Sequence, residues 1–192
     1  MPSSKRKNKG SPLRSLIIYW SATGNTEKVA ETIQESLGQE NVAITLLKVA
    51  DADKEDLYAY DLVFLGAPPY QFLPPEPVIR FVKEKMRFYS ERGDIKLGAP
   101  KRPGKRAVVF CTYSGPHTGV NEAIPVVKYL GQFLEHLGFE VVGEWYTVGE
   151  FHNREDNSTR GRLGDIRGRP NQQDLALVKK NVSGLIRNIS KG

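Results

Sequence analysis

Apolar residues follow two alternating patterns along the chain. The first is a short, nearly unbroken run bounded by turns or polar residues, and five such runs cover residues 16–20, 42–47, 62–66, 107–111 and 139–146. The runs are rich in aliphatic and aromatic residues, which is typical of buried strands. They predict five strands, and the fourth is too apolar for an exposed edge.

The second pattern places apolar residues at helical spacing. Val29, Ala30, Ile33 and Leu37 recur in this way before Gly38, directly after the first predicted strand and its turn. Later stretches repeat this spacing. It predicts helices over residues 78–89, where Ile79, Val82 and Met86 form the apolar face, 125–137 and 172–189.

The order of these elements predicts the fold class. Parallel neighbouring strands need crossover connections, and helix-length segments separate the predicted strands. We therefore expect a three-layer α/β fold, a doubly wound five-stranded parallel sheet with helices on both faces. Two segments fit neither pattern: residues 51–58 are acidic and helix-prone but of undecided form, and residues 149–171 are long and polar.

Charge is unevenly distributed along the 192 residues. The first fourteen hold five Lys or Arg and no acid, and the formal net charge of +6 falls to +1 without them. We predict a basic flexible tail over 1–14 and one domain over 15–192. A solvated tail is favoured over one that binds nucleic acid or an acidic membrane, so no specific nucleic-acid partner is expected.

Three observations bear on location. No stretch approaches the roughly 18 apolar residues that cross a bilayer, so no membrane span is expected. The N-terminal segment lacks the apolar run of a signal peptide. The single cysteine, Cys111, cannot form an internal disulfide and is expected to be a small core residue. These features predict a cytoplasmic protein.

The loop after the first predicted strand carries the strongest chemical signal. Ligands of parallel sheets bind at the carboxyl ends of the strands, where the strand order reverses. This loop opens a helix, and its hydroxyl and amide groups can surround a phosphate. It lacks the Lys of triphosphate loops, which favours a terminal monophosphate. A turn that only caps the helix is the alternative. The turn consists of Ser21, Ala22, Thr23, Gly24, Asn25 and Thr26.

This turn resembles the phosphate-binding turn of flavodoxins, which has a hydroxyl residue, any residue and then Thr-Gly-Asn-Thr after the first strand. The resemblance covers about residues 16–189. It implies a flavodoxin-like sheet in the order 2-1-3-4-5, with FMN as the cofactor and its phosphate on the turn.

Two further loops resemble the family's flavin loops. In the second loop, prolines fix the backbone and Tyr70, with Phe72 as second candidate, is expected to stack on the flavin. The third loop's amides would face the flavin's pyrimidine edge, and its glycines permit close approach. Packing of the aromatics under the loop, and a His117 that is only a polar loop residue, are the alternatives. The candidate residues are Pro68, Pro69, Tyr70, Gln71 and Phe72, then Thr112, Tyr113, Ser114, Gly115, His117 and Gly119.

Two functions from different classes remain open. The first is an electron carrier between protein partners, although 67–75 and 112–121 contain no Asp or Glu, whereas the family's carriers usually present an acidic face. The alternative is an FMN-dependent oxidoreductase that passes hydride from NAD(P)H to a quinone or another small acceptor, with Tyr113 or His117 near the acceptor. An Arg-rich segment, 151–170, could attract NADPH or an acidic partner. A flavin-free scaffold ranks last.

Overall fold

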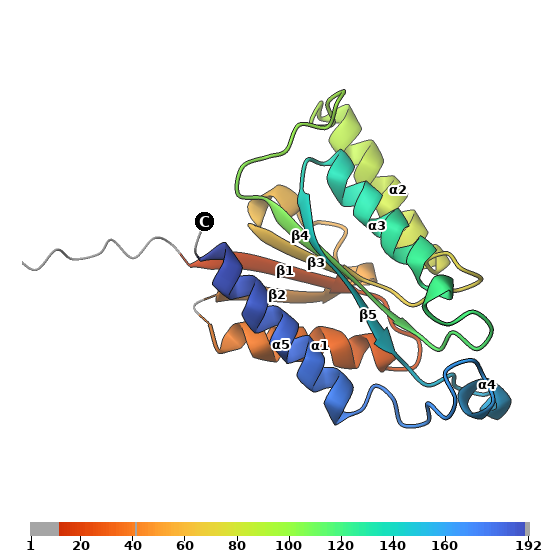
Figure 1. Ribbon diagram of the computed structural model, residues 1–192. Helices are drawn as coiled ribbons and strands as arrows, with labels where there is room; N and C mark the ends of the chain where they lie inside the picture. The colour runs from red at the N-terminus through yellow and green to blue at the C-terminus, as the bar shows by residue number, and fades with distance from the viewer. Residues whose placement is uncertain (1–11, 41, 191–192) are drawn as a thin grey trace, which may run out of the picture.

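A single parallel sheet forms the centre of the molecule (Figure 1). The computed structural model describes residues 12–40 and 42–190. The sheet order is β2-β1-β3-β4-β5, and every neighbouring pair is parallel. The predicted five-stranded sheet and its order are therefore confirmed. The strands are β1 (Leu13–Tyr19), β2 (Val42–Lys48), β3 (Leu62–Gly66), β4 (Arg106–Tyr113) and β5 (Glu140–Val148).

Two pairs of helices cover the two faces of the sheet. On one face lie α1 (Asn25–Gly38) and α5 (Gln172–Ile189), and on the other α2 (Glu76–Glu91) and α3 (Ile124–His136) (Figure 1). This arrangement confirms the predicted three-layer α/β class. None of the helices in the described part of the chain is long and apolar enough to cross a membrane.

Side chains of the central strands alternate between the two helical layers. In β1, Ile17 and Tyr19 belong to the core under α1 and α5, whereas Leu16 and Ile18 belong to the core under α2 and α3. Each buried aliphatic side chain contributes roughly 1.5–3 kcal/mol relative to exposure. Burial on both faces explains why these strands have unbroken apolar runs.

Several element boundaries differ from the predicted ones. Strand β4 continues through Thr112 and Tyr113, which were expected in the loop, because it remains paired with β5 as far as the partners Tyr113 and Val148. Helix α2 begins at Glu76. Its buried face holds Val78, Phe81, Val82, Lys85 and Tyr89, while Ile79 and Met86 are only half-buried.

The undecided segments contain short helices. Near 51–58 lie two 3-10 turns, η1 (Val49–Asp51) and η2 (Leu57–Ala59). The polar segment 149–171 contains α4 (Glu155–Thr159), and η3 (Gly119–Glu122) precedes α3. The predicted tail lies outside the described residues as far as residue 11, and its last two residues, Leu13 and Arg14, belong to β1.

Candidate functional site

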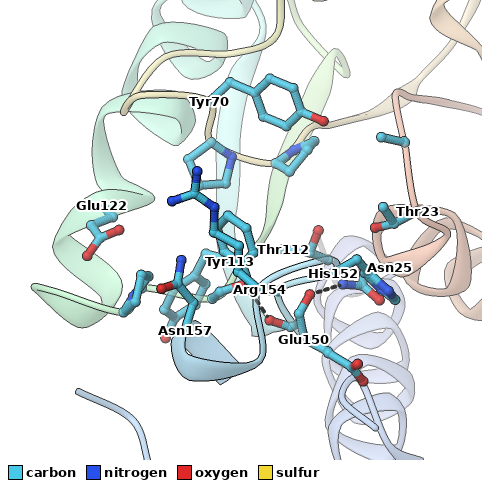
Figure 2. Close-up of a pocket in the computed structure, with 18 of the residues that line it drawn as sticks. Thr23, Asn25, Tyr70, Thr112, Tyr113, Glu122, Glu150, His152, Arg154 and Asn157 are labelled. Atoms are coloured by element: carbon cyan, nitrogen blue, oxygen red, sulfur yellow. Dashed lines mark hydrogen bonds between the residues drawn. The ribbon is translucent and has the colours of Figure 1, made fainter. Parts of the chain in front are cut away.

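A cavity of about 750 Å³ lies at the carboxyl edge of the sheet. Its walls are the loops after β1, β3 and β4 together with the chain after β5 (Figure 2). Gly24 and Gly119 are the only predicted site residues that do not line it. Those that line it are Ser21, Ala22, Thr23, Asn25, Thr26, Pro68, Pro69, Tyr70, Gln71, Phe72, Thr112, Tyr113, Ser114, Gly115 and His117.

The turn after β1 leaves the start of α1 open toward the cavity. Gly24 is the N-cap residue, with φ +92°, and no side chain in the described residues caps the helix there. A left-handed backbone favours glycine. The turn is closed by the Gly24 amide, which donates to Ser21 Oγ at 3.1 Å. The first amides of α1 have no partner within the helix, so they are available to an anion.

Two polar side chains of this turn hold the site together. The Thr26 and Thr112 hydroxyl oxygens are 2.7 Å apart in a buried hydrogen bond between α1 and β4. Asn25 Nδ2 donates to the Glu150 carbonyl oxygen at 2.9 Å. Thr26 and Asn25 therefore also fix the position of the turn relative to β4 and the chain after β5.

The loop after β3 ends in a tight hairpin. Tyr70 and Leu73 exchange backbone hydrogen bonds of 2.8 and 3.1 Å, and the two residues between them, Gln71 and Phe72, have φ of 49° and 71°. Left-handed backbone is costly for such side chains. The Tyr70 ring packs edge-on against Trp20, with centroids 5.3 Å apart. Tyr70 and Phe72 are 51% and 57% exposed at the cavity rim.

The loop after β4 is folded back on itself. Gly115 has φ +51°, and a Cβ there would lie 2.5 Å from the Gly119 carbonyl oxygen. The Glu122 carboxylate accepts hydrogen bonds from the backbone amides of His117 and Thr118, at 2.8 and 2.6 Å. The His117 side chain is exposed. Both glycines therefore serve the tight turn.

Tyr113 lines the cavity, whereas Cys111 is buried in the core. Burial raises the pKa of the Tyr113 hydroxyl, although Arg169 acts in the opposite direction. The hydroxyl therefore stays protonated at neutral pH and is able to donate a hydrogen bond. Burial also raises the pKa of the Cys111 thiol, which lies in the core. A thiol in that position is poorly suited to redox chemistry.

The sequence did not identify the fourth wall. The chain leaving β5 lines the cavity, and a buried nitrogen of this wall, His152 Nε2, has no hydrogen-bond partner among the described residues. Such an atom fits a bound polar ligand, because buried polar groups are normally paired. The sequence signal that could have indicated this wall was the Arg-rich composition of residues 151–170. The additional lining residues are Pro116, Glu122, Gly149, Glu150, Phe151, His152, Asn153, Arg154 and Asn157.

The sequence matches a known family model and several known proteins. The family model described as Flavodoxin matches residues 17–176. The flavodoxin of Trichodesmium erythraeum is 29% identical over 161 residues, covering 83% of this chain and 86% of its own length. Flavodoxin 1 of Escherichia coli is 41% identical over 56 residues, covering 29% of this chain and 31% of its own.

Solved structures show the same fold at lower identity. A flavodoxin from the domain Archaea has a TM-score of 0.62 at 15% identity and covers 93% of this chain and 99% of its own. Oxidised flavodoxin 1 from Bacillus cereus has a TM-score of 0.62 at 17% identity and covers 91% of this chain and 97% of its own. Because the family model spans most of the chain and the sheet order agrees, the chain belongs to the flavodoxin family, whose members bind FMN.

Proposed function

We propose that this protein carries electrons between protein partners by means of FMN bound in the cavity. The observation that carries the proposal is the start of α1, which opens on the cavity without a side-chain cap in the described residues. Helix starts of this kind bind anions through their free amides and their dipole. The terminal phosphate of FMN is such an anion, and the bound flavin supplies the electron-accepting chemistry.

The remaining walls suit a flat, partly apolar ring system. Pro68 and Pro69 line the cavity, and so does Tyr113, whose hydroxyl stays protonated at neutral pH. Binding sites for small molecules combine apolar walls with a few placed polar groups. Thr23 is exposed in the phosphate turn, so its hydroxyl is free to donate to the phosphate.

The rim of the cavity favours a protein partner. Tyr70, Phe72 and Phe151 line the cavity and are 51%, 57% and 38% exposed. Exposed aromatic side chains gathered at one place are typical of surfaces that contact other proteins. The electron would leave at this edge, where a docked partner comes near the flavin.

The test is a titration of the purified apoprotein with FMN, followed by the quenching of flavin fluorescence, with riboflavin as the matched ligand without phosphate. We expect tight FMN binding, much weaker riboflavin binding, and a Thr23→Val variant that loses affinity for FMN but not for riboflavin. Absence of FMN binding at micromolar protein would overturn the proposal.

The FMN-dependent NAD(P)H oxidoreductase remains an untested alternative, and the FMN-loaded protein distinguishes the two functions. A carrier is expected to pass electrons to a protein acceptor and to show no steady NAD(P)H oxidation with several quinones. Sustained turnover with any of them would replace the carrier proposal by the oxidoreductase. The cytoplasmic location also stays a prediction.

A further inference from the structure

The chain between β5 and α5, residues 149–171, folds over the cavity, and we call it the clamp segment. It is bonded to the end of β4 and the loop after it at three points. The Gly149 amide donates to the Tyr113 carbonyl oxygen at 2.8 Å, Ser114 Oγ donates to the Gly149 carbonyl oxygen at 2.8 Å, and the Arg162 amide donates to the Pro116 carbonyl oxygen at 2.8 Å. The clamp segment is therefore a fixed wall of the site.

Internal contacts give the clamp segment a defined shape. Ser158 Oγ bonds both the amide and the carbonyl of Phe151, at 2.8 and 3.0 Å. The Ile166 amide donates to the Ser158 carbonyl oxygen at 2.7 Å, and the Ile166 side chain is buried. These contacts surround the backbone that carries Arg154, so its position at the cavity is set by the fold.

Arg154 differs from most of its neighbours in charge pairing. Arg160, Arg167 and Arg169 each face a carboxylate, those of Asp156, Asp165 and Asp174 respectively. No carboxylate within the described residues forms an ion pair with Arg154, and no other Lys or Arg there lines the cavity. Its guanidinium is therefore available to a ligand.

Neither of the two acids of the cavity wall forms an ion pair with Arg154 in the described part of the chain. Glu122 accepts from the backbone amides of the loop after β4, and Glu150 Oε2 accepts from the Gly168 amide at 2.6 Å. Their carboxylates are thus held by backbone donors.

The direction of the Arg154 side chain indicates which part of a ligand it meets. Figure 2 shows it extending from the clamp segment toward the loop that carries Tyr70, on the far side of the cavity from Thr23. The phosphate turn lies on the Thr23 side. The guanidinium therefore faces the part of the cavity between the two ring-binding loops and lies away from the anion site at α1.

We propose that Arg154 stabilises the negative charge which FMN acquires on reduction, and so raises the reduction potential of the bound cofactor. This inference rests on the proposed binding of FMN. A permanently charged guanidinium in the wall favours the more negative state of a ligand, and it does so without rearrangement of the site. Arg154 is exposed, so solvent screening limits the effect.

The experiment compares Arg154→Gln with Arg154→Lys and Arg160→Gln. Arg160 belongs to the same clamp segment but does not line the cavity, so its replacement removes one positive charge nearby. For each variant we would measure the midpoint potential of bound FMN by spectroelectrochemistry and the dissociation constants of oxidised FMN, reduced FMN and oxidised riboflavin.

The expected result is specific to the neutral variant. Arg154→Gln should weaken the binding of reduced FMN about tenfold more than that of oxidised FMN, a decrease of about 30 mV for a two-electron couple. Arg154→Lys should retain most of the potential, and Arg160→Gln should leave it near the wild-type value.

Three results would overturn the inference. An equal loss of affinity for both redox states would indicate a purely structural role for Arg154. A loss for oxidised FMN that is absent for riboflavin would assign the guanidinium to the phosphate. An equal decrease of potential in Arg160→Gln would show a general effect of charge. Failure of the wild-type protein to bind FMN would instead refute the proposed function itself.

Discussion

The hydroxyl oxygens of Thr26 and Thr112 lie 2.7 Å apart, and this buried hydrogen bond joins the first turn of α1 to the end of β4. Each hydroxyl is the hydrogen-bond partner of the other, and both residues line the cavity. The anion site and the ring-binding loop after β4 are thus aligned by one short contact between residues 86 positions apart.

Replacing both members of this pair should cost less stability than the two single replacements added together. Thr112→Val leaves the Thr26 hydroxyl buried without its partner, which costs about 1–3 kcal/mol. The double variant Thr26→Val, Thr112→Val removes both hydroxyls at nearly constant shape, so its loss should be clearly smaller than the sum of the single losses. Urea unfolding of the apoprotein measures all four forms. Strictly additive losses would show that the hydrogen bond is not the coupling contact.

Gly115 should tolerate no side chain. In Gly115→Ala the new Cβ meets the Gly119 carbonyl at 2.5 Å in a left-handed backbone, so we expect a loss of about 2–4 kcal/mol and weaker FMN binding. Gly93→Ala is the matched control, since Gly93 has φ +74° but nothing within 4 Å. Its loss should be only about 1–2 kcal/mol, with FMN affinity unchanged. Thermal unfolding and flavin titration distinguish the two.

Tyr70 should contribute more to flavin binding than Phe72. The Tyr70 ring is fixed against Trp20, which reduces the entropy lost when it covers a ligand. Tyr70→Ala should lower FMN affinity about tenfold, a size typical of aromatic stacking. Tyr70→Phe should keep most of the affinity, and Phe72→Ala should have the smaller effect. A larger loss in Phe72→Ala would reverse the assignment.

The Asp174 carboxylate predicts a loss of stability in acid. Burial raises its pKa, but hydrogen bonds from Arg169 and from the Asn171 amide act more strongly, so the net pKa is lowered. A lowered pKa gives stability that is present above the unfolded value, about 3.9, and is lost as the pH falls through the folded value. Thermal unfolding between pH 6 and pH 3 should show this loss in wild type and less of it in Asp174→Asn.

Asp165→Asn is the control for that measurement. Arg167 lowers the pKa of Asp165 to about 2 in a comparable pair, but the pair is exposed to solvent. Screening makes such pairs weak. The stability of Asp165→Asn should therefore follow wild type closely over the same pH range.

Residues buried on both sides of the sheet were predictable, because their apolar runs follow directly from that burial. Lys85 shows the limit of this reasoning. It is buried in α2 with its Nζ donating to the carbonyls of Asp53 and Glu55, at 2.8 and 2.5 Å. Burial lowers the pKa of its ammonium group. Those acceptors are backbone atoms of a turn that is distant in sequence. The spacing of apolar residues therefore gives no indication that Lys85 is buried.

The candidate site was predictable where side chains carry the chemistry and not where the backbone does. The turn before Thr26 was found because its hydroxyl and amide residues are unusual together. The wall after β5 was missed because its links use the carbonyl oxygens of Gly149 and Glu150, which every residue type possesses. The extension of β4 to Tyr113 likewise depends on backbone pairing with β5.

The clamp segment has a consequence for the order of events during synthesis. A nascent chain that has left the ribosome as far as residue 148 already contains all five strands of the sheet. It lacks Gly149, Glu150 and the rest of the wall that bonds to Asn25 and Ser114. Because domains form as their residues emerge, the sheet can assemble before the fourth wall exists. Retention of the cofactor is therefore expected only after the clamp segment has emerged.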